Sequence, residues 1–337
     1  MIRALVAWSC GVAVLVAAPT RWIPGVTAQT PALDVAPRAP GYVVPRTPWG
    51  DPDIEGIWPS TEYVSVPLQR SQQFGMRTML TDEEVAQRAK QEAAQKEGFE
   101  RDGAGGATGA PGHWLEWGKT QRQASLIVDP PNGRMPPLTP EGQARAAAAP
   151  VGTFGNRPLS GPADFTMWER CLSRGVLGST LPVLYNSGID ITQGPGMVAI
   201  RYEMVHDHRV IPLDRRTSLA GAVRQYMGDA RGRWEGDTLV VETANFTDNR
   251  LGVGISGGGA PASSVLRIVE RFTRVAHDTL RYEATVTDPR TWTAPWTVAF
   301  PLRLTPGYAM HEYACHEGNY GLLNALSGAR AAERDAR

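Results

Sequence analysis

One stretch decides the predicted fold: Arg224-Gln-Tyr-Met-Gly-Asp-Ala-Arg-Gly-Arg-Trp-Glu-Gly-Asp-Thr-Leu-Val-Val-Glu-Thr-Ala-Asn-Phe246. Residues 235–237 are typical of a tight turn, because Gly236 adopts a positive φ at no steric cost and Asp237 tolerates it. The segment that follows, 238–246, is rich in β-branched residues, and its three adjacent apolar side chains from Leu239 to Val241 indicate a strand covered on both faces. The stretch therefore predicts a β-hairpin.

Alternation of apolar and polar residues extends the β pattern on both sides of the hairpin. Residues 197–210 predict one long strand, with Val198, Ile200, Tyr202, Met204, His206, His208 and Val210 on one face. Further strands are predicted over residues 265–274, 279–288, 296–304 and 310–316, followed by a closing helix from about residue 320. Short turns without long intervening helices favour an antiparallel meander over a parallel sheet. We therefore predict a mainly β fold, with the meander closed as a calycin- or lipocalin-like barrel or a strongly curved sheet.

The first 28 residues are typical of an export signal. Met1-Ile-Arg3 is a short basic start, Ala4 to Ala18 is an apolar run, and Val26-Thr27-Ala28 is a small-residue cleavage site. The apolar run is short for a membrane span and is followed by prolines, so we expect no stable membrane span after cleavage. The alternative is an uncleaved N-terminal anchor. The sequence predicts a periplasmic or secreted protein.

Charge composition argues against a polyanionic partner. The full chain has 34 Lys and Arg against 34 Asp and Glu, and removal of residues 1–28 takes away Arg3 and Arg21, leaving 32 against 34. A chain with a net charge near −2 has no electrostatic footprint for nucleic acid. We expect no nucleic-acid partner and no cofactor.

Residues 29–160 read as an arm around the β-core of residues 161–337. Closely spaced prolines between residues 31 and 52 exclude a regular helix or ladder there. Thr81-Asp-Glu-Glu84 is a capping box that predicts a helix to about Lys96, and Thr139-Pro140-Glu141 predicts a second, short helix. No part of this segment has the apolar periodicity expected of a domain with its own hydrophobic core.

Two cysteines remain after the predicted loss of Cys10 with the signal. Cys171 and Cys315 would then lie in a compartment that permits disulfides. A bridge between them and two buried free thiols are both open interpretations.

Several long motifs resemble those of a large family of secreted, uncharacterised proteins from environmental bacteria. The resemblance is carried by Trp168-Glu-Arg-Cys171, His206 with Arg209-Val-Ile-Pro-Leu-Asp214, Gly228-Asp-Ala-Arg-Gly-Arg-Trp-Glu-Gly-Asp-Thr-Leu-Val-Val-Glu-Thr243, and Glu312-Tyr-Ala-Cys-His-Glu-Gly-Asn319. The resemblance implies export and a shared fold, and it implies no reaction.

The candidate catalytic residues are His206, His208 and Glu270. On one uninterrupted strand, His206 and His208 would point to the same apolar side, as a pair able to act in acid/base chemistry or to share a metal. Glu270 lies between Ile268 and Phe272, where burial would favour general acid/base work. The alternatives are structural: histidines that close the mouth of a barrel, and a carboxylate paired with an arginine of a neighbouring strand. No metal site is predicted.

These observations leave three classes of function open. The first is an exported β-barrel protein that binds a small, largely apolar molecule in an interior cavity. The second is a secreted hydrolase or lyase that uses the three candidate residues, and the third is an interaction module without a cavity. The side chains expected to line the cavity are Tyr202, Met204, Phe272, Tyr282 and Trp234.

Overall fold

The computed structural model of the chain describes residues 35–104, 112–150, 152, 158–214, 219, 221–247, 252–255, 258–259 and 261–336. The predicted export signal, residues 1–28, lies outside the described residues. The described residues all belong to one compact unit that spans residues 31–337.

The predicted hairpin is confirmed. It consists of β6 (Asp229–Glu235) and β7 (Thr238–Ala244), with Glu235 opposite Thr238 across the turn. Gly236 has a φ of 60°, and a Cβ at this position would meet nothing within 4 Å, so the turn needs glycine for its backbone conformation and not for space. The apolar run from Leu239 to Val241 is fully buried, as the sequence predicted.

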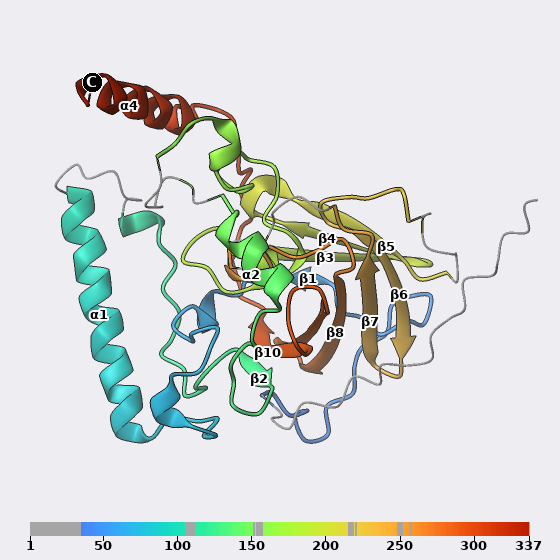
Figure 1. Ribbon diagram of the computed structural model, residues 1–337. Helices are drawn as coiled ribbons and strands as arrows, with labels where there is room; N and C mark the ends of the chain where they lie inside the picture. Colours follow the sequence, from blue (N-terminus) through green and yellow to red (C-terminus); the bar gives the residue numbers. More distant parts are fainter. Residues whose placement is uncertain are drawn as a thin grey trace, which may run out of the picture. The chain divides into compact units, whose positions relative to one another are not determined.

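The strands form two antiparallel sheets (Figure 1). A four-stranded sheet has the order β1-β3-β4-β5, and a six-stranded sheet has the order β2-β10-β9-β8-β7-β6. The remaining strands are β1 (Gly56–Ile57), β2 (Ile127–Asp129), β3 (Ile189–Gly194), β4 (Met197–Tyr202), β5 (His208–Pro212), β8 (Arg267–Ala276), β9 (Thr279–Thr287) and β10 (Trp296–Arg303). Apart from β1 and β2, each strand neighbours the next one in sequence within its sheet, so the predicted meander is present.

The meander does not close into a hydrogen-bonded barrel within the described residues, which corrects that part of the expectation. The break lies between β5 and β6, where packing replaces the ladder. A Cβ on Gly232 of β6 would come within 2.7 Å of the Leu213 side chain and 2.8 Å of the Ile211 side chain. The absence of a side chain at Gly232 therefore lets the end of β5 lie directly against β6. One hydrophobic core takes side chains from both sheets.

The predicted strand over residues 197–210 is wrong in its middle. The chain leaves β4 at Tyr202, turns through η5 (Met204–His206) and enters β5 at His208. Val205 and His206 have φ values of 61° and 45°, a left-handed conformation that is costly for a β-branched residue. Because of this turn, the side chains that point into the core from β5 are those of Arg209 and Ile211, and not those of His208 and Val210.

The C-terminal part differs from the prediction in one element. Residues 310–316 form an irregular segment and not a strand. The closing helix is present as α4 (Gly321–Asp335).

The arm is integrated with the sheets. Its strands β1 and β2 are edge strands of the four-stranded and six-stranded sheets, respectively. Ile54, Trp58 and Leu126 of this segment are completely buried in the common core. The described part of residues 29–160 thus contributes to the core that the later strands build.

Both predicted helix starts are confirmed. Glu84 accepts a hydrogen bond from the backbone of Thr81, and the Thr81 hydroxyl accepts one from the backbone of Glu84, at the start of α1 (Asp82–Ala104). Thr139 caps α2 (Pro140–Ala147). The other helices are α3 (Val176–Thr180), η1 (Thr61–Tyr63), η2 (Gln72–Phe74), η3 (Gly112–Trp114) and η4 (Pro162–Asp164). Within the described ranges, no helix combines the length and the apolar character needed to cross a membrane.

Candidate functional site

The structure does not bring the three candidate catalytic residues into one environment. His206 lies in the turn between β4 and β5 and is exposed, and its Nδ1 lies 3.0 Å from the carbonyl oxygen of Tyr313. His208 is the first residue of β5 and is also exposed, whereas Glu270 of β8 is completely buried. The strand break explains the difference, because it removes the shared face on which the histidine prediction depended.

Glu270 pairs with an arginine, as the structural alternative predicted. Arg209 Nη1 and Nη2 donate to the two carboxylate oxygens of Glu270 at 2.5 and 2.7 Å. The arginine comes from β5, so the pair joins the two sheets through the core. A two-pronged arrangement of this kind satisfies both carboxylate oxygens, which a buried charge requires.

Two tyrosines complete this buried network. The Tyr282 hydroxyl donates to Glu270 at 3.0 Å, and the Tyr202 ring lies under the Arg209 guanidinium with 5.9 Å between Cζ and the ring centroid. Burial, and then the neighbouring Glu270 carboxylate, hold the pKa of Tyr282 well above its usual value. Burial also raises the pKa of Tyr202 to about 12. Both hydroxyls are therefore protonated at neutral pH and act as structural hydrogen-bonding groups.

The residues expected to line a ligand cavity fill the core instead. Phe272 packs on Tyr282 with ring centroids 5.0 Å apart, and Tyr282 packs on Phe300 at 5.4 Å. Tyr202 and Met204 are buried, and Trp234 is partly buried against the same core. Aromatic stacking thus occupies the space in which an interior ligand was predicted.

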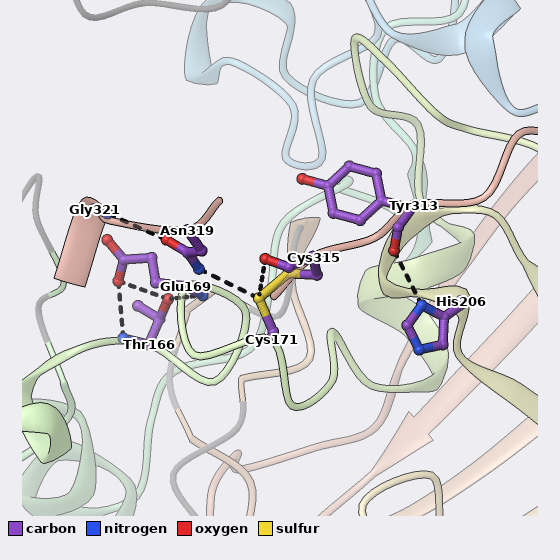
Figure 2. The surroundings of a disulfide bond; sticks show 8 residues. All are labelled: Thr166, Glu169, Cys171, His206, Tyr313, Cys315, Asn319 and Gly321. Atoms are coloured by element: carbon purple, nitrogen blue, oxygen red, sulfur yellow. Dashed lines mark hydrogen bonds between the residues drawn. A yellow bond between two sulfur atoms is a disulfide. The ribbon is translucent and has the colours of Figure 1, made fainter. Parts of the chain in front are cut away.

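The disulfide between Cys171 and Cys315 is confirmed (Figure 2). It attaches the irregular C-terminal segment to the residues that precede α3. The same segment is fixed at a second place by the contact between the Tyr313 carbonyl and His206, also drawn in Figure 2. Two of the motifs that carry the family resemblance, 168–171 and 312–319, therefore meet at this bridge.

Glu203 fixes the C-terminal segment at a third place, and sequence reasoning missed it. This buried carboxylate accepts hydrogen bonds from the Tyr308 hydroxyl at 2.7 Å, from the His311 backbone at 3.1 Å and from Asn186 Nδ2 at 3.0 Å. The Tyr308 hydroxyl also lies 3.1 Å from Glu116. Burial and the hydrogen bond to Glu203 raise the pKa of Tyr308 above its usual value. Glu203 comes directly after the end of β4 and has left the strand conformation, so the alternation of residues 197–210 does not predict the direction of its side chain.

Most charged residues of the central hairpin pair with one another, whereas Asp237 in its turn pairs with Arg38 and Arg46. Asp229 contacts Arg231 at 2.5 Å, and Arg233 contacts Glu242 at 2.5 Å and Glu235 at 2.8 Å. In the part of the chain that the structure describes, no group of three or more His, Cys, Asp or Glu side chains is placed to hold a metal ion.

An apolar recess lies beside α3, at the ends of β7 and β8. Its wall combines Val176 and Leu177 of α3 with Phe246, Leu266 and Ile268. Val253 and Ala262 complete the apolar lining. The recess is open on one side, and its enclosed part has room for about one or two water molecules. It can therefore hold a small apolar group whose remainder lies on the rim.

The rim of the recess is partly apolar and carries one cation. Tyr226 lines the recess and is 41% exposed, and Val265, which precedes the wall residue Leu266 in sequence, is 46% exposed. Arg224 is exposed, and its Nη1 donates to the carbonyl oxygens of Phe246 at 3.1 Å and Ser264 at 2.8 Å. Phe246 belongs to the wall and Ser264 lies two residues before the wall residue Leu266, so backbone next to the wall fixes the guanidinium. Sequence reasoning missed this site because loop residues from distant segments build most of it.

Comparisons of the chain with models of protein families, with curated proteins and with solved structures found no match.

Proposed function

We propose that this chain is a binding protein for a small, largely apolar molecule, and that the molecule occupies the recess beside α3. The observation that supports this proposal most is the combination of an open apolar recess with exposed apolar residues on its rim. Exposed apolar surface next to a concave apolar wall is typical of a ligand site. The filled core argues for this place over the interior of the sheets.

The size of the recess limits the ligand. A methyl or ethyl group or the edge of one aromatic ring suits the enclosed part, and the remainder of the molecule would lie against Tyr226. Binding at such a site draws on the apolar area removed from water, at about 25 cal/mol per Å².

The test is a titration with N-phenylnaphthylamine, an uncharged apolar dye whose fluorescence rises away from water. We expect saturable binding of one dye per chain, lost in Ala262→Phe, which places a ring in the recess. Ala332→Phe adds the same ring at an exposed position of α4 and should bind the dye like the original chain. Ala262→Leu is the milder variant if Ala262→Phe unfolds. Absence of saturable binding, or binding that both Ala262 variants retain, would contradict the proposal and favour an interaction module.

We also propose that the protein is exported to the periplasm or secreted. Residues 1–28 have the pattern of a cleaved signal, and the disulfide between Cys171 and Cys315 is compatible with an oxidising compartment. Fractionation of expressing cells should place the chain outside the cytoplasm, with Gln29 as its first residue. A chain that stays in the cytoplasm with residues 1–28 attached would contradict this.

A further inference from the structure

Arg224 is an exposed arginine with two properties that bear on ligand binding. Its Nη1 is held by two backbone carbonyls, which fixes the direction of the guanidinium. Among the described residues, it has no carboxylate within ion-pair distance, although most of the nearby charged residues of the hairpin are paired. Within the described part of the chain, the group is therefore oriented without being neutralised.

Part of the guanidinium remains available for a ligand. A guanidinium carries five N–H donors in a planar fork, and Nη1 supplies the two that reach the Phe246 and Ser264 carbonyls. The donors on Nε and Nη2 have the parallel arrangement that binds the two oxygens of a carboxylate. A guanidinium held in place by its other nitrogen loses less conformational entropy on binding than a free arginine side chain does.

The position of this cation relative to the recess sets the chemistry of the ligand. Phe246 belongs to the wall of the recess, and Ser264 is two residues from the wall residue Leu266. An anionic group bound to Arg224 would thus lie at the mouth, next to an apolar group that enters the recess. Two acidic side chains of the described neighbouring segments are engaged elsewhere: Asp229 by Arg231 and by the Leu219 backbone, and Asp288 by Ser263 and Thr291.

We infer that the ligand is a small apolar acid: a compact alkyl or aryl group in the recess and a carboxylate, or an anion of similar geometry, on Arg224. This inference rests on the proposed function and adds the charge of the ligand to it.

A matched pair of dyes tests the inference. Anilinonaphthalenesulfonate is N-phenylnaphthylamine with an added sulfonate, so the two dyes differ in the anionic group. We expect the sulfonate to bind about tenfold more tightly or better, since a hydrogen bond to a charged group contributes at least that much. Arg224→Gln should abolish this preference and leave the affinity for the uncharged dye unchanged within about twofold.

Two control variants separate the possible outcomes. Arg224→Lys keeps the charge but not the fork, and it should retain part of the preference. Arg101→Gln removes an exposed arginine of α1 and should have no effect on either dye. An equal affinity for both dyes, or a preference for the sulfonate that survives in Arg224→Gln, would overturn the inference while leaving the proposed function standing. If the original chain does not bind the uncharged dye, the proposed function itself is overturned.

Discussion

The Arg209 guanidinium and the Glu270 carboxylate meet inside the core although their strands belong to different sheets. Both Nη atoms of Arg209 donate to Glu270, at 2.5 and 2.7 Å, and the exposed fractions of the two side chains are 4% and 0%. The pair therefore connects the sheets where the ladder between β5 and β6 is missing.

This pair predicts an asymmetric response to substitution. Glu270→Leu leaves the Arg209 guanidinium buried without its partner, and the free energy of unfolding should fall by about 3–5 kcal/mol. The double variant Arg209→Met/Glu270→Leu should recover most of that loss, because the desolvation cost of both charges disappears with the pair. Urea unfolding of the original chain and of these two variants measures the effect.

An exposed pair supplies the control for that experiment. Arg233 and Glu242 on the hairpin are both about half exposed, and Glu242→Gln should cost about 1 kcal/mol or less. If the double variant is as unstable as Glu270→Leu alone, the explanation is wrong. The ion pair itself would then stabilise the core, and the unpaired Arg209 charge would not be the cause of the loss.

The disulfide should make a large contribution to stability. Cys171 and Cys315 are separated by 144 residues, and cross-linking a loop of that length in the unfolded chain stabilises the folded state by about 4–5 kcal/mol in the chain-entropy model. The double variant Cys171→Ser/Cys315→Ser should lose an amount in the range of about 2–5 kcal/mol. Thiol titration of denatured, unreduced residues 29–337 should detect no free thiol. Free thiols, or an unchanged urea midpoint in the double variant, would contradict the bridge.

Alkaline pH should destabilise the fold through buried tyrosines. Burial raises the pKa of Tyr202 to about 12, so the folded state holds this proton more tightly than the unfolded chain, whose tyrosines titrate near the usual 10. The stabilising contribution is complete below pH of about 10 and is lost as the pH rises toward about 12, because there the unfolded state binds fewer protons. The loss from this one group amounts to about 3 kcal/mol at the upper limit.

Tyr202→Phe isolates that effect. Its free energy of unfolding should fall less steeply between pH of about 10 and 12 than that of the original chain, whereas Tyr320→Phe, at a 68% exposed position, should follow the original chain. Identical slopes in all three proteins would mean that Tyr202 does not titrate differently in the folded state.

Local chemistry accounts for what the sequence predicted correctly. The hairpin follows from the conformation that Gly236 permits, and the starts of α1 and α2 follow from the capping side chains of Thr81 and Thr139. Each of these features depends on residues within a few positions of one another, so the sequence pattern contains the whole cause.

Distant contacts account for what the sequence could not predict. The left-handed turn at Val205 and His206 breaks the alternation of residues 197–210, and it is held by a contact between His206 and Tyr313, 107 residues away. That turn shifts Arg209 inward and the two histidines outward, which replaces the predicted catalytic set with a structural ion pair. The recess was missed for the same reason, since no single segment contains its wall and its cation.

The central claim is that a ligand enters the recess beside α3 and not the core between the sheets. Methyl chemical shifts recorded during a titration with N-phenylnaphthylamine test it most directly, because both regions contain methyl groups. The account predicts shifts at Val176, Leu177, Val253, Leu266 and Ile268, with the core residues Leu239 and Val298 unaffected. The claim would be contradicted if the methyl chemical shifts of Leu239 and Val298 changed in a saturable way while those of the recess residues stayed constant.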